Sequence, residues 1–183
     1  MSNLQVTAWQ TAGPFFTFAL IKEEMRYVVR EDHPDAIQVT GRIFDGEGAV
    51  VPDAIVETWQ ANPSGDYVIR PVAEGEFQGF GRSGCDADGR FRIITLKPGP
   101  VREDDQGVQA PHLEVSIFAR GVMNRLVTRV YFGDESTANS NCPILARVEP
   151  DRRDQLVARL VAPRTYELEL HLQGERESPF FAI

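Results

Sequence analysis

A histidine and a glutamate two positions apart are the residues of this sequence best suited to chemistry. They lie in Ala110–Ile117, where polar and apolar residues alternate as in a half-buried strand. Because residues two apart project from the same face of a strand, we expect His112 and Glu114 to share one face and the leucine between them to face the other way. This pair could be two metal ligands, or what remains of a metal site that has been lost.

A metal site built from oxygen and nitrogen ligands is the chemistry that these residue types could support. Tyr67 joins His112 and Glu114 as a third candidate ligand, and Tyr131 and Tyr166 are more distant ones. Phenolate, imidazole and carboxylate groups suit iron better than copper(I) or zinc–sulfur chemistry. In the alternative interpretation the histidine hydrogen-bonds a neighbour, the glutamate is solvated or ion-paired, and the tyrosine is a packing aromatic.

Other kinds of site lack their motifs. The sequence has no Gly-x-Ser-x-Gly elbow, and neither His33 nor His171 is placed by a motif as a catalytic base. Cys85 and Cys142 are the two cysteines and form no CxxC spacing, which excludes a structural zinc site and argues against a disulfide framework.

The charge balance excludes two classes of partner. The formal net charge is −8, whereas nucleic acids and anionic membranes both require a basic face. No secretory signal and no apolar run of membrane-spanning length is visible, so we expect a cytoplasmic protein.

Period-two alternation between turn signals predicts an all-β fold, a two-sheet antiparallel β-sandwich. One apolar stripe at helical spacing predicts a short helix in the C-terminal half, over Pro150–Ala162. The expected strands are Ile37–Phe44, Ala54–Gln60, Arg90–Leu96, His112–Ala119, Arg125–Phe132 and Thr165–Gln173.

The chain length of 183 residues predicts one domain with a preceding segment. We assign residues 35–183 to the sandwich and residues 1–34 to an extended N-terminal arm that contacts a partner. The first twenty residues of the arm are rich in turn residues and carry four aromatics, which suggest that this segment lies against its own domain or another chain: Trp9, Phe15, Phe16 and Phe18.

An ordered set of sequence blocks resembles the intradiol ring-cleavage dioxygenases. Each block alone is weak, but together they cover nearly the whole chain in the family's order. The blocks are Thr11–Pro14, Trp59–Tyr67, Gly79–Arg82, Lys97–Gly99, Ala110–Glu114, Ser116–Gly121 and Thr128–Phe132.

The resemblance implies a ferric iron held by two tyrosines and two histidines, and this chain retains half of that set. Tyr67 stands at the first tyrosine position and His112 at the first histidine position. Val101 replaces the second tyrosine and Glu114 the second histidine. A valine coordinates nothing, and a carboxylate adds a negative charge, so the resemblance implies a remnant of the metal site that binds no metal. We call these four positions the remnant site.

In this family such a chain is the alpha subunit, which pairs with a beta subunit carrying Fe(III) and assembles into a higher hetero-oligomer. The resemblance implies that Thr11, Gly13 and Pro14 line the substrate pocket of the beta subunit. Arg129 is the candidate cation for a substrate carboxylate, because its guanidinium can form two parallel hydrogen bonds. A self-sufficient iron enzyme with a Tyr/His/Glu site and a β-sandwich binding module are the alternatives.

Overall fold

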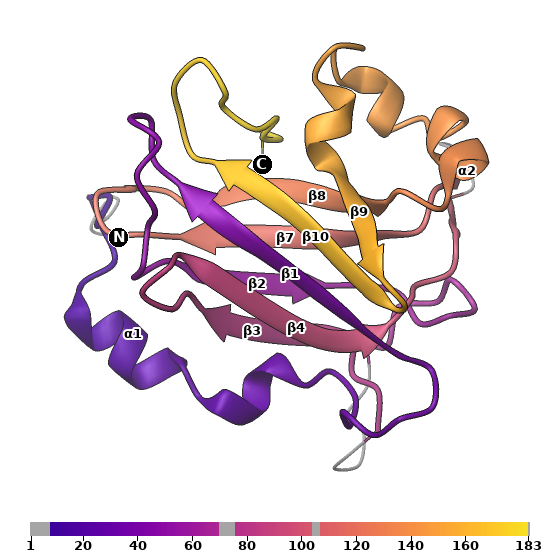
Figure 1. Cartoon of the computed structure of the whole chain (residues 1–183), viewed down its shortest axis with the longest axis horizontal. Coiled ribbons are helices and arrows are strands. Elements are labelled where there is room, and N and C mark those ends of the chain that lie inside the picture. Colours follow the sequence, from indigo (N-terminus) through magenta and orange to yellow (C-terminus); the bar gives the residue numbers. More distant parts are fainter. Residues whose placement is uncertain (1–7, 70–75, 104–106, 183) are drawn as a thin grey trace, which may run out of the picture.

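The computed structural model describes residues 8–69, 76–103 and 107–182, and residues 1–7 of the predicted arm lie outside them. Ten strands dominate the described chain (Figure 1). The strands are β1 (Ala36–Phe44), β2 (Ile55–Trp59), β3 (Phe80–Gly84), β4 (Arg90–Leu96), β5 (Val101–Glu103), β6 (Gly107–Gln109), β7 (His112–Phe118), β8 (Leu126–Phe132), β9 (Val157–Ala162) and β10 (Thr165–His171).

Short helices connect or flank the strands. The α-helices are α1 (Pro14–Leu20) and α2 (Ser136–Ser140), and the 3₁₀ helices are η1 (Glu23–Arg26), η2 (Leu145–Arg147) and η3 (Arg153–Leu156). No helix in the described part of the chain has both the length and the apolar character needed to cross a bilayer.

The prediction of a mostly β fold is confirmed, whereas the division into two sheets is not. Eight strands form one sheet in the order β3-β2-β7-β8-β9-β10-β1-β4, because β9 pairs with both β8 and β10. The outermost strands β3 and β4 contact each other, so the sheet curls almost into a barrel (Figure 1). The pairing is also not wholly antiparallel, since β1–β10 and β8–β9 are parallel.

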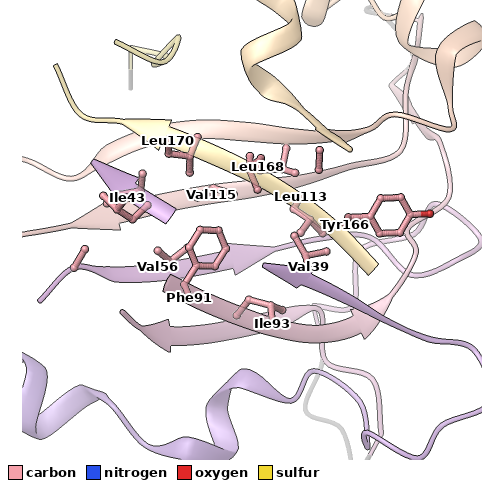
Figure 2. Packing of buried hydrophobic residues seen from close by; sticks show 14 of the residues in the cluster. Val39, Ile43, Val56, Phe91, Ile93, Leu113, Val115, Tyr166, Leu168 and Leu170 are labelled. Carbon is pink, nitrogen blue, oxygen red and sulfur yellow. The ribbon is translucent and has the colours of Figure 1, made fainter. Parts of the chain in front are cut away.

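The core lies between the two layers of the curled sheet. Val39 of β1, Phe91 of β4 and Leu170 of β10 project inward from one layer and meet Val56 of β2 and Val115 of β7 from the other (Figure 2). All are at most 2% exposed. Each strand contributes alternate residues to this core, so the outer face is left for polar contacts.

The predicted helix over Pro150–Ala162 is wrong. The segment begins with the 3₁₀ helix η3 and continues as β9, which pairs with β10. Leu160 and Val161, two residues of the predicted apolar stripe, are 49% and 50% exposed, so the stripe is not one buried helix face. Strand pairing overrides a weak helical pattern here, as tertiary context often does. The α-helix of the C-terminal half is instead α2 (Ser136–Ser140), which precedes the predicted segment.

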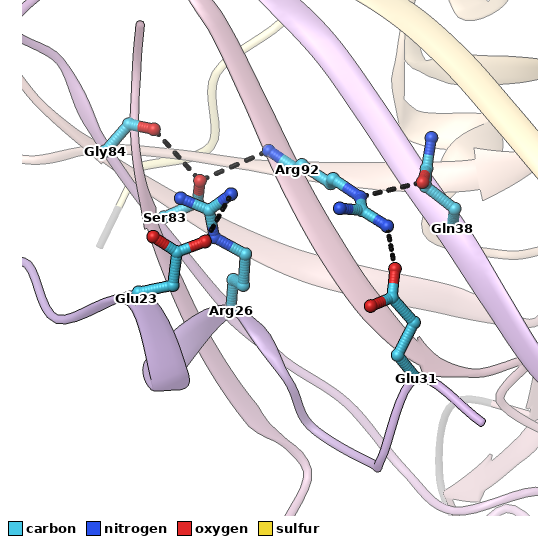
Figure 3. Close-up of polar contacts among 7 residues, drawn as sticks. All are labelled: Glu23, Arg26, Glu31, Gln38, Ser83, Gly84 and Arg92. Carbon is cyan, nitrogen blue, oxygen red and sulfur yellow. Dashed lines mark hydrogen bonds and ion pairs between the residues drawn. The ribbon is translucent and has the colours of Figure 1, made fainter. Parts of the chain in front are cut away.

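The described part of the N-terminal arm is not extended. Residues from Pro14 form α1, and the chain returns to the domain before β1, where the backbone N–H of Val28 donates to Ile94 O at 2.8 Å. Glu31 then forms an ion pair with Arg92 of β4, whose Nε donates to Gln38 of β1 at 2.7 Å (Figure 3). The second half of the arm is therefore fixed to its own domain.

Candidate functional site

The strand that carries His112 and Glu114 has the facing predicted from its sequence. His112 and Glu114 lie on the outer face of β7, while Leu113, Val115 and Ile117 are at most 1% exposed within the core. His112 is buried although it faces outward, because a second apolar cluster that includes Ala110 and Tyr131 lies at this end of the strand.

The imidazole of His112 has one fixed and one unpaired nitrogen. Nδ1 lies 2.7 Å from the carbonyl oxygen of Ala110, which can only accept, so this geometry assigns the proton to Nδ1. Nε2 is buried without a hydrogen-bond partner and lies 3.7 Å from Glu114 Oε1. That separation is an electrostatic contact, too long for a hydrogen bond.

Glu114 is held by an arginine on the neighbouring strand. Arg129 of β8 lies directly opposite it and donates through Nη2 to Glu114 Oε1 at 2.8 Å and through Nη1 to Gln109 Oε1 at 2.6 Å. Contacts with His112 and the positive charge of Arg129 hold the pKa of Glu114 below its usual value, against the opposing effect of burial.

Arg129 is enclosed by groups that favour its charge. Burial by itself lowers the pKa of Arg129, but Glu114, Tyr131 and Tyr67 together outweigh it and raise that pKa. The ring of Tyr67 stacks on that of Trp59, with centroids 6.0 Å apart and an interplanar angle of 13°.

Val101, the remaining position of the remnant site, is a packing residue. It begins β5, is 6% exposed and pairs with Gln109 of β6. Because Gln109 accepts a hydrogen bond from Arg129, the contacts run from Val101 through Gln109 and Arg129 to Glu114 and His112. The structure thus brings together all four remnant positions together with Arg129.

Two glycines keep the loops of this site together. A Cβ on Gly65 would lie 2.2 Å from Pro100 O, and one on Gly99 would lie 2.3 Å from Pro63 O, so only glycine permits this approach. Both glycine N–H groups donate to the carbonyl oxygen of Asn62, at 2.9 and 3.0 Å. The loop of Tyr67 is thereby fixed against that of Val101, so the scaffold of the site persists although two of its four ligands are absent.

Lys97 fixes the start of the loop that leads to Val101 through ion pairs. Its Nζ lies 2.8 Å from Asp134 Oδ2 and 2.6 Å from Glu135 Oε1, and the hydroxyl of Tyr166 donates to Asp134 at 2.9 Å. These contacts give the Lys-Pro-Gly block a structural role.

The N-terminal residues that the sequence singled out lie at the opposite end of β7. The backbone N–H of Gly121 donates to Thr11 Oγ1 at 2.7 Å, and the Phe16 ring packs 5.5 Å from that of Phe118. His112 and Phe118 are six residues apart on one strand, which separates the two ends by about 20 Å. The structure therefore does not bring Thr11 to Arg129.

A second arginine, Arg120, lies near Thr11, and the sequence did not predict it as a site residue. Arg120 precedes Gly121, is exposed, and among the described residues forms one salt bridge, from its Nε to Asp53 Oδ2 at 3.3 Å. Gly13 is exposed with open space around it, and Pro14 begins α1. Arg120 belongs to the sequence block Ser116–Gly121, but its place near Thr11 follows from the hydrogen bond between Thr11 and Gly121.

Residues 12–170 match the family model described as Dioxygenase. The chain belongs to this dioxygenase family. The match covers most of the sequence, and it spans the remnant site as well as the end of β7 near Thr11.

Two alpha-chain relatives within the dioxygenase family match along nearly their whole length, and a beta chain matches over part of its length. The chain is 37% identical to the protocatechuate 3,4-dioxygenase alpha chain of Pseudomonas putida, covering 97% of this chain and 96% of the relative. It is 35% identical to the alpha chain from Burkholderia cepacia, with 100% of both chains covered. The beta chain from Burkholderia cepacia is 34% identical, over 79% of this chain and 67% of that one.

A solved structure confirms the dioxygenase fold. The catechol 1,2-dioxygenase of Pseudomonas arvilla C-1 superposes with a TM-score of 0.60 at 22% identity, covering 81% of this chain. This chain spans 55% of the length of that structure.

The residues at the remnant site of this dioxygenase chain do not fit an iron centre. Among the described residues, no group of three or more His, Cys, Asp or Glu side chains could hold a metal ion. Val101 offers no donor atom, and the carboxylate of Glu114 already binds Arg129. Only His112 Nε2 remains as an unpaired ligand atom, and one nitrogen does not hold a metal.

Proposed function

We propose that this chain is the alpha subunit of a protocatechuate 3,4-dioxygenase, and that it completes the substrate pocket of an iron-bearing beta subunit. The reaction is intradiol cleavage of protocatechuate by O₂ to 3-carboxy-cis,cis-muconate. The observation that carries the proposal is the closed remnant site within a scaffold similar to full-length alpha chains.

The proposal assigns the cofactor to the partner. Fe(III) in the beta subunit supplies the activation of the bound catechol toward O₂, and this chain supplies shape and positioning. Holding a substrate in reactive geometry can lower a barrier by several kcal/mol without a chemical group. A beta subunit as partner, a higher hetero-oligomer, a cytoplasmic location and the division into residues 1–34 and 35–183 are all parts of this proposal.

The pocket-lining residues we propose are Thr11, Gly13 and Pro14, and we add Arg120. These residues lie at the exposed end of β7, where Thr11 is fixed by Gly121. The side chain of Arg120 is 80% exposed, and its one salt bridge leaves guanidinium donors available for a carboxylate. Protocatechuate carries a carboxylate, so an exposed guanidinium at the rim of its pocket gives selectivity over plain catechols.

The substrate role that the sequence suggested for Arg129 stays a prediction, and its contacts do not support it. Its side chain is 15% exposed and donates to both Glu114 and Gln109. A substrate carboxylate would have to displace Glu114, and Arg129 lies opposite Glu114, about 13 Å along β7 from Phe118 at the end near Thr11.

Expression of the chain alone and together with its beta subunit tests the proposal. We expect the isolated chain to contain no stoichiometric iron and to show no tyrosinate-to-iron absorption band. The co-purified pair is expected to contain iron and to consume O₂ with protocatechuate.

Stoichiometric iron and turnover in the isolated chain would instead identify a self-sufficient enzyme. A chain that forms no complex with a beta subunit and stays monomeric would identify a lone β-sandwich module. Either result contradicts the alpha-subunit proposal.

A further inference from the structure

One side chain contacts or approaches most of the remnant site. Arg129 donates to Glu114 Oε1, and the same oxygen lies 3.7 Å from His112 Nε2. Its other arm donates to Gln109, the strand partner of Val101. The guanidinium is therefore linked to the Val101, His112 and Glu114 positions of the remnant site.

We infer that Arg129 supplies the positive charge at the remnant site, and that its guanidinium, hydrogen-bonded to Glu114 and Gln109, excludes a metal ion from this site. The inference rests on the proposed function and deepens it. It holds that restoring the lost histidine would not by itself let the site bind a metal ion, because the guanidinium of Arg129 would still exclude the ion.

The physical basis is charge and hydrogen bonding. A guanidinium offers five N–H donors and no lone pair, so it pairs with carboxylate and amide oxygens but ligates no metal. A metal ion near Glu114 would have to displace these hydrogen bonds and bring two positive charges together in a partly buried site. Arginine does not lose its proton in proteins, so the exclusion is independent of pH over the physiological range.

A second ion pair on the same sheet provides a matched control. Arg82 of β3 pairs with Glu57 of β2 at 2.6 Å, and its side chain is 15% exposed, the same as that of Arg129. Glu114, the partner of Arg129, lies beside His112, whose Nε2 has no hydrogen-bond partner. Tyr67 and His112 also keep the residue types of two family iron ligands. The strand partners of Glu57 are Arg82 and Ser116, neither of which is a histidine.

The test compares four variants of the full chain: Glu114→His, Arg129→Met, the double variant Glu114→His/Arg129→Met, and the control Arg82→Met. Each is titrated with Co(II) chloride, whose visible absorption reports coordination number, after a thermal melt has confirmed its fold. The double variant also removes the uncompensated carboxylate that Arg129→Met leaves, so it tests the inference even where the single variant does not fold.

We expect the double variant to bind Co(II) at least about tenfold more tightly than Glu114→His, which restores the histidine pair but keeps the arginine. The control Arg82→Met should bind no better than the natural chain. Co-expressed with the beta subunit, the double variant should raise the iron content from one ion per alpha–beta pair to two.

Equal Co(II) affinity of Glu114→His and the double variant would overturn the inference, because the arginine would then exclude nothing. If Glu114→His and the double variant both bind Co(II) as weakly as the natural chain, the inference is overturned as well. In both cases the proposed function stands if the natural chain is metal-free. Stoichiometric iron in the natural chain alone is the separate result that rejects the proposed function.

Discussion

The two ends of β7 differ in whether the side chains around them are already paired or are left exposed to solvent. At the His112 end, Glu114 is bound by Arg129, and the loops are fixed by Gly65 and Gly99. At the Phe118 end, the nearby arm and loop leave large apolar and charged side chains in solvent. These are Trp9, Phe15, Phe18 and Arg120.

The difference indicates where a partner binds. A polar group that already has its hydrogen bonds gains little from a new contact, whereas exposed aromatic surface gains from each Å² that is buried. The closed end retains the scaffold of a metal site, and the open end has the features of an interface. Variants at each end should therefore affect different measurements.

The largest effect is expected at the open end, on assembly. Phe15 and Phe18 are 84% and 86% exposed, so replacing both with serine should leave the melting temperature of the isolated chain unchanged. Burial of each ring against the beta subunit is worth about 1.5–3 kcal/mol, so the double variant should lose roughly 3–6 kcal/mol of association free energy. Sedimentation velocity of the mixed chains measures this loss.

Phe16 is the matched control for that experiment, because it lies on the same helix but packs against Phe118. Phe16→Ser should lower the melting temperature of the isolated chain. Undiminished assembly by the Phe15/Phe18 variant would place the partner elsewhere.

The next largest effect concerns the stability of the closed end. Arg129→Met leaves the half-buried carboxylate of Glu114 without its partner, and we expect a loss of roughly 1–3 kcal/mol in the free energy of unfolding, between the values for exposed and buried ion pairs. Urea denaturation of the isolated chain measures it. Arg129→Met/Glu114→Gln should recover part of the loss, whereas no recovery would show that Glu114 is not the group left unpaired.

A smaller effect is expected from Arg120→Gln in the assembled enzyme. Loss of a charge-assisted hydrogen bond to the substrate carboxylate should raise KM for protocatechuate about tenfold, which corresponds to ~1.4 kcal/mol. Stability should not change, because the side chain is 80% exposed. Arg129→Lys is the comparison at the other end of β7, and a larger KM effect there than for Arg120→Gln would restore the substrate role expected of Arg129.

The fold and the facing of β7 were accessible from the sequence because period-two alternation is a local signal. The outer and inner faces of β7 follow directly from it. The connectivity was not accessible, since β9 joins the two layers through pairings with β8 and β10 that no local pattern encodes. The apolar stripe over Pro150–Ala162 gave a wrong helix prediction for the same reason.

The remnant site was predictable only in part. The residue types at Val101 and Glu114 are visible in the sequence, but the role of Gln109 is not, because it depends on a long-range contact with Arg129. Arg120 was missed because Thr11 and Gly121 meet across 110 residues of chain. Long-range contacts between loops leave no periodic trace in sequence.

The smallest predicted effect is a pH dependence that distinguishes the two ion pairs. The pKa of Glu114 is lowered from its ordinary value of 4.5 by His112 and Arg129, against burial, whereas Asp53 at the open end pairs with an exposed arginine. A carboxylate whose folded pKa is depressed contributes stability that is fully present above its unfolded pKa. That stability is lost as the pH falls below about 4.5 toward the folded pKa.

Glu114→Gln should therefore flatten the fall in stability of the isolated chain as the pH drops below about 4.5, while leaving the dependence of stability on pH unchanged above that value. Asp53→Asn should have no such effect, because an exposed pair contributes little. Urea midpoints measured across this pH range decide the matter. An unaltered acid limb in Glu114→Gln would mean that Arg129 does not hold the carboxylate in its charged form, and the closed end would then lack the internal ion pair that separates it from the open one.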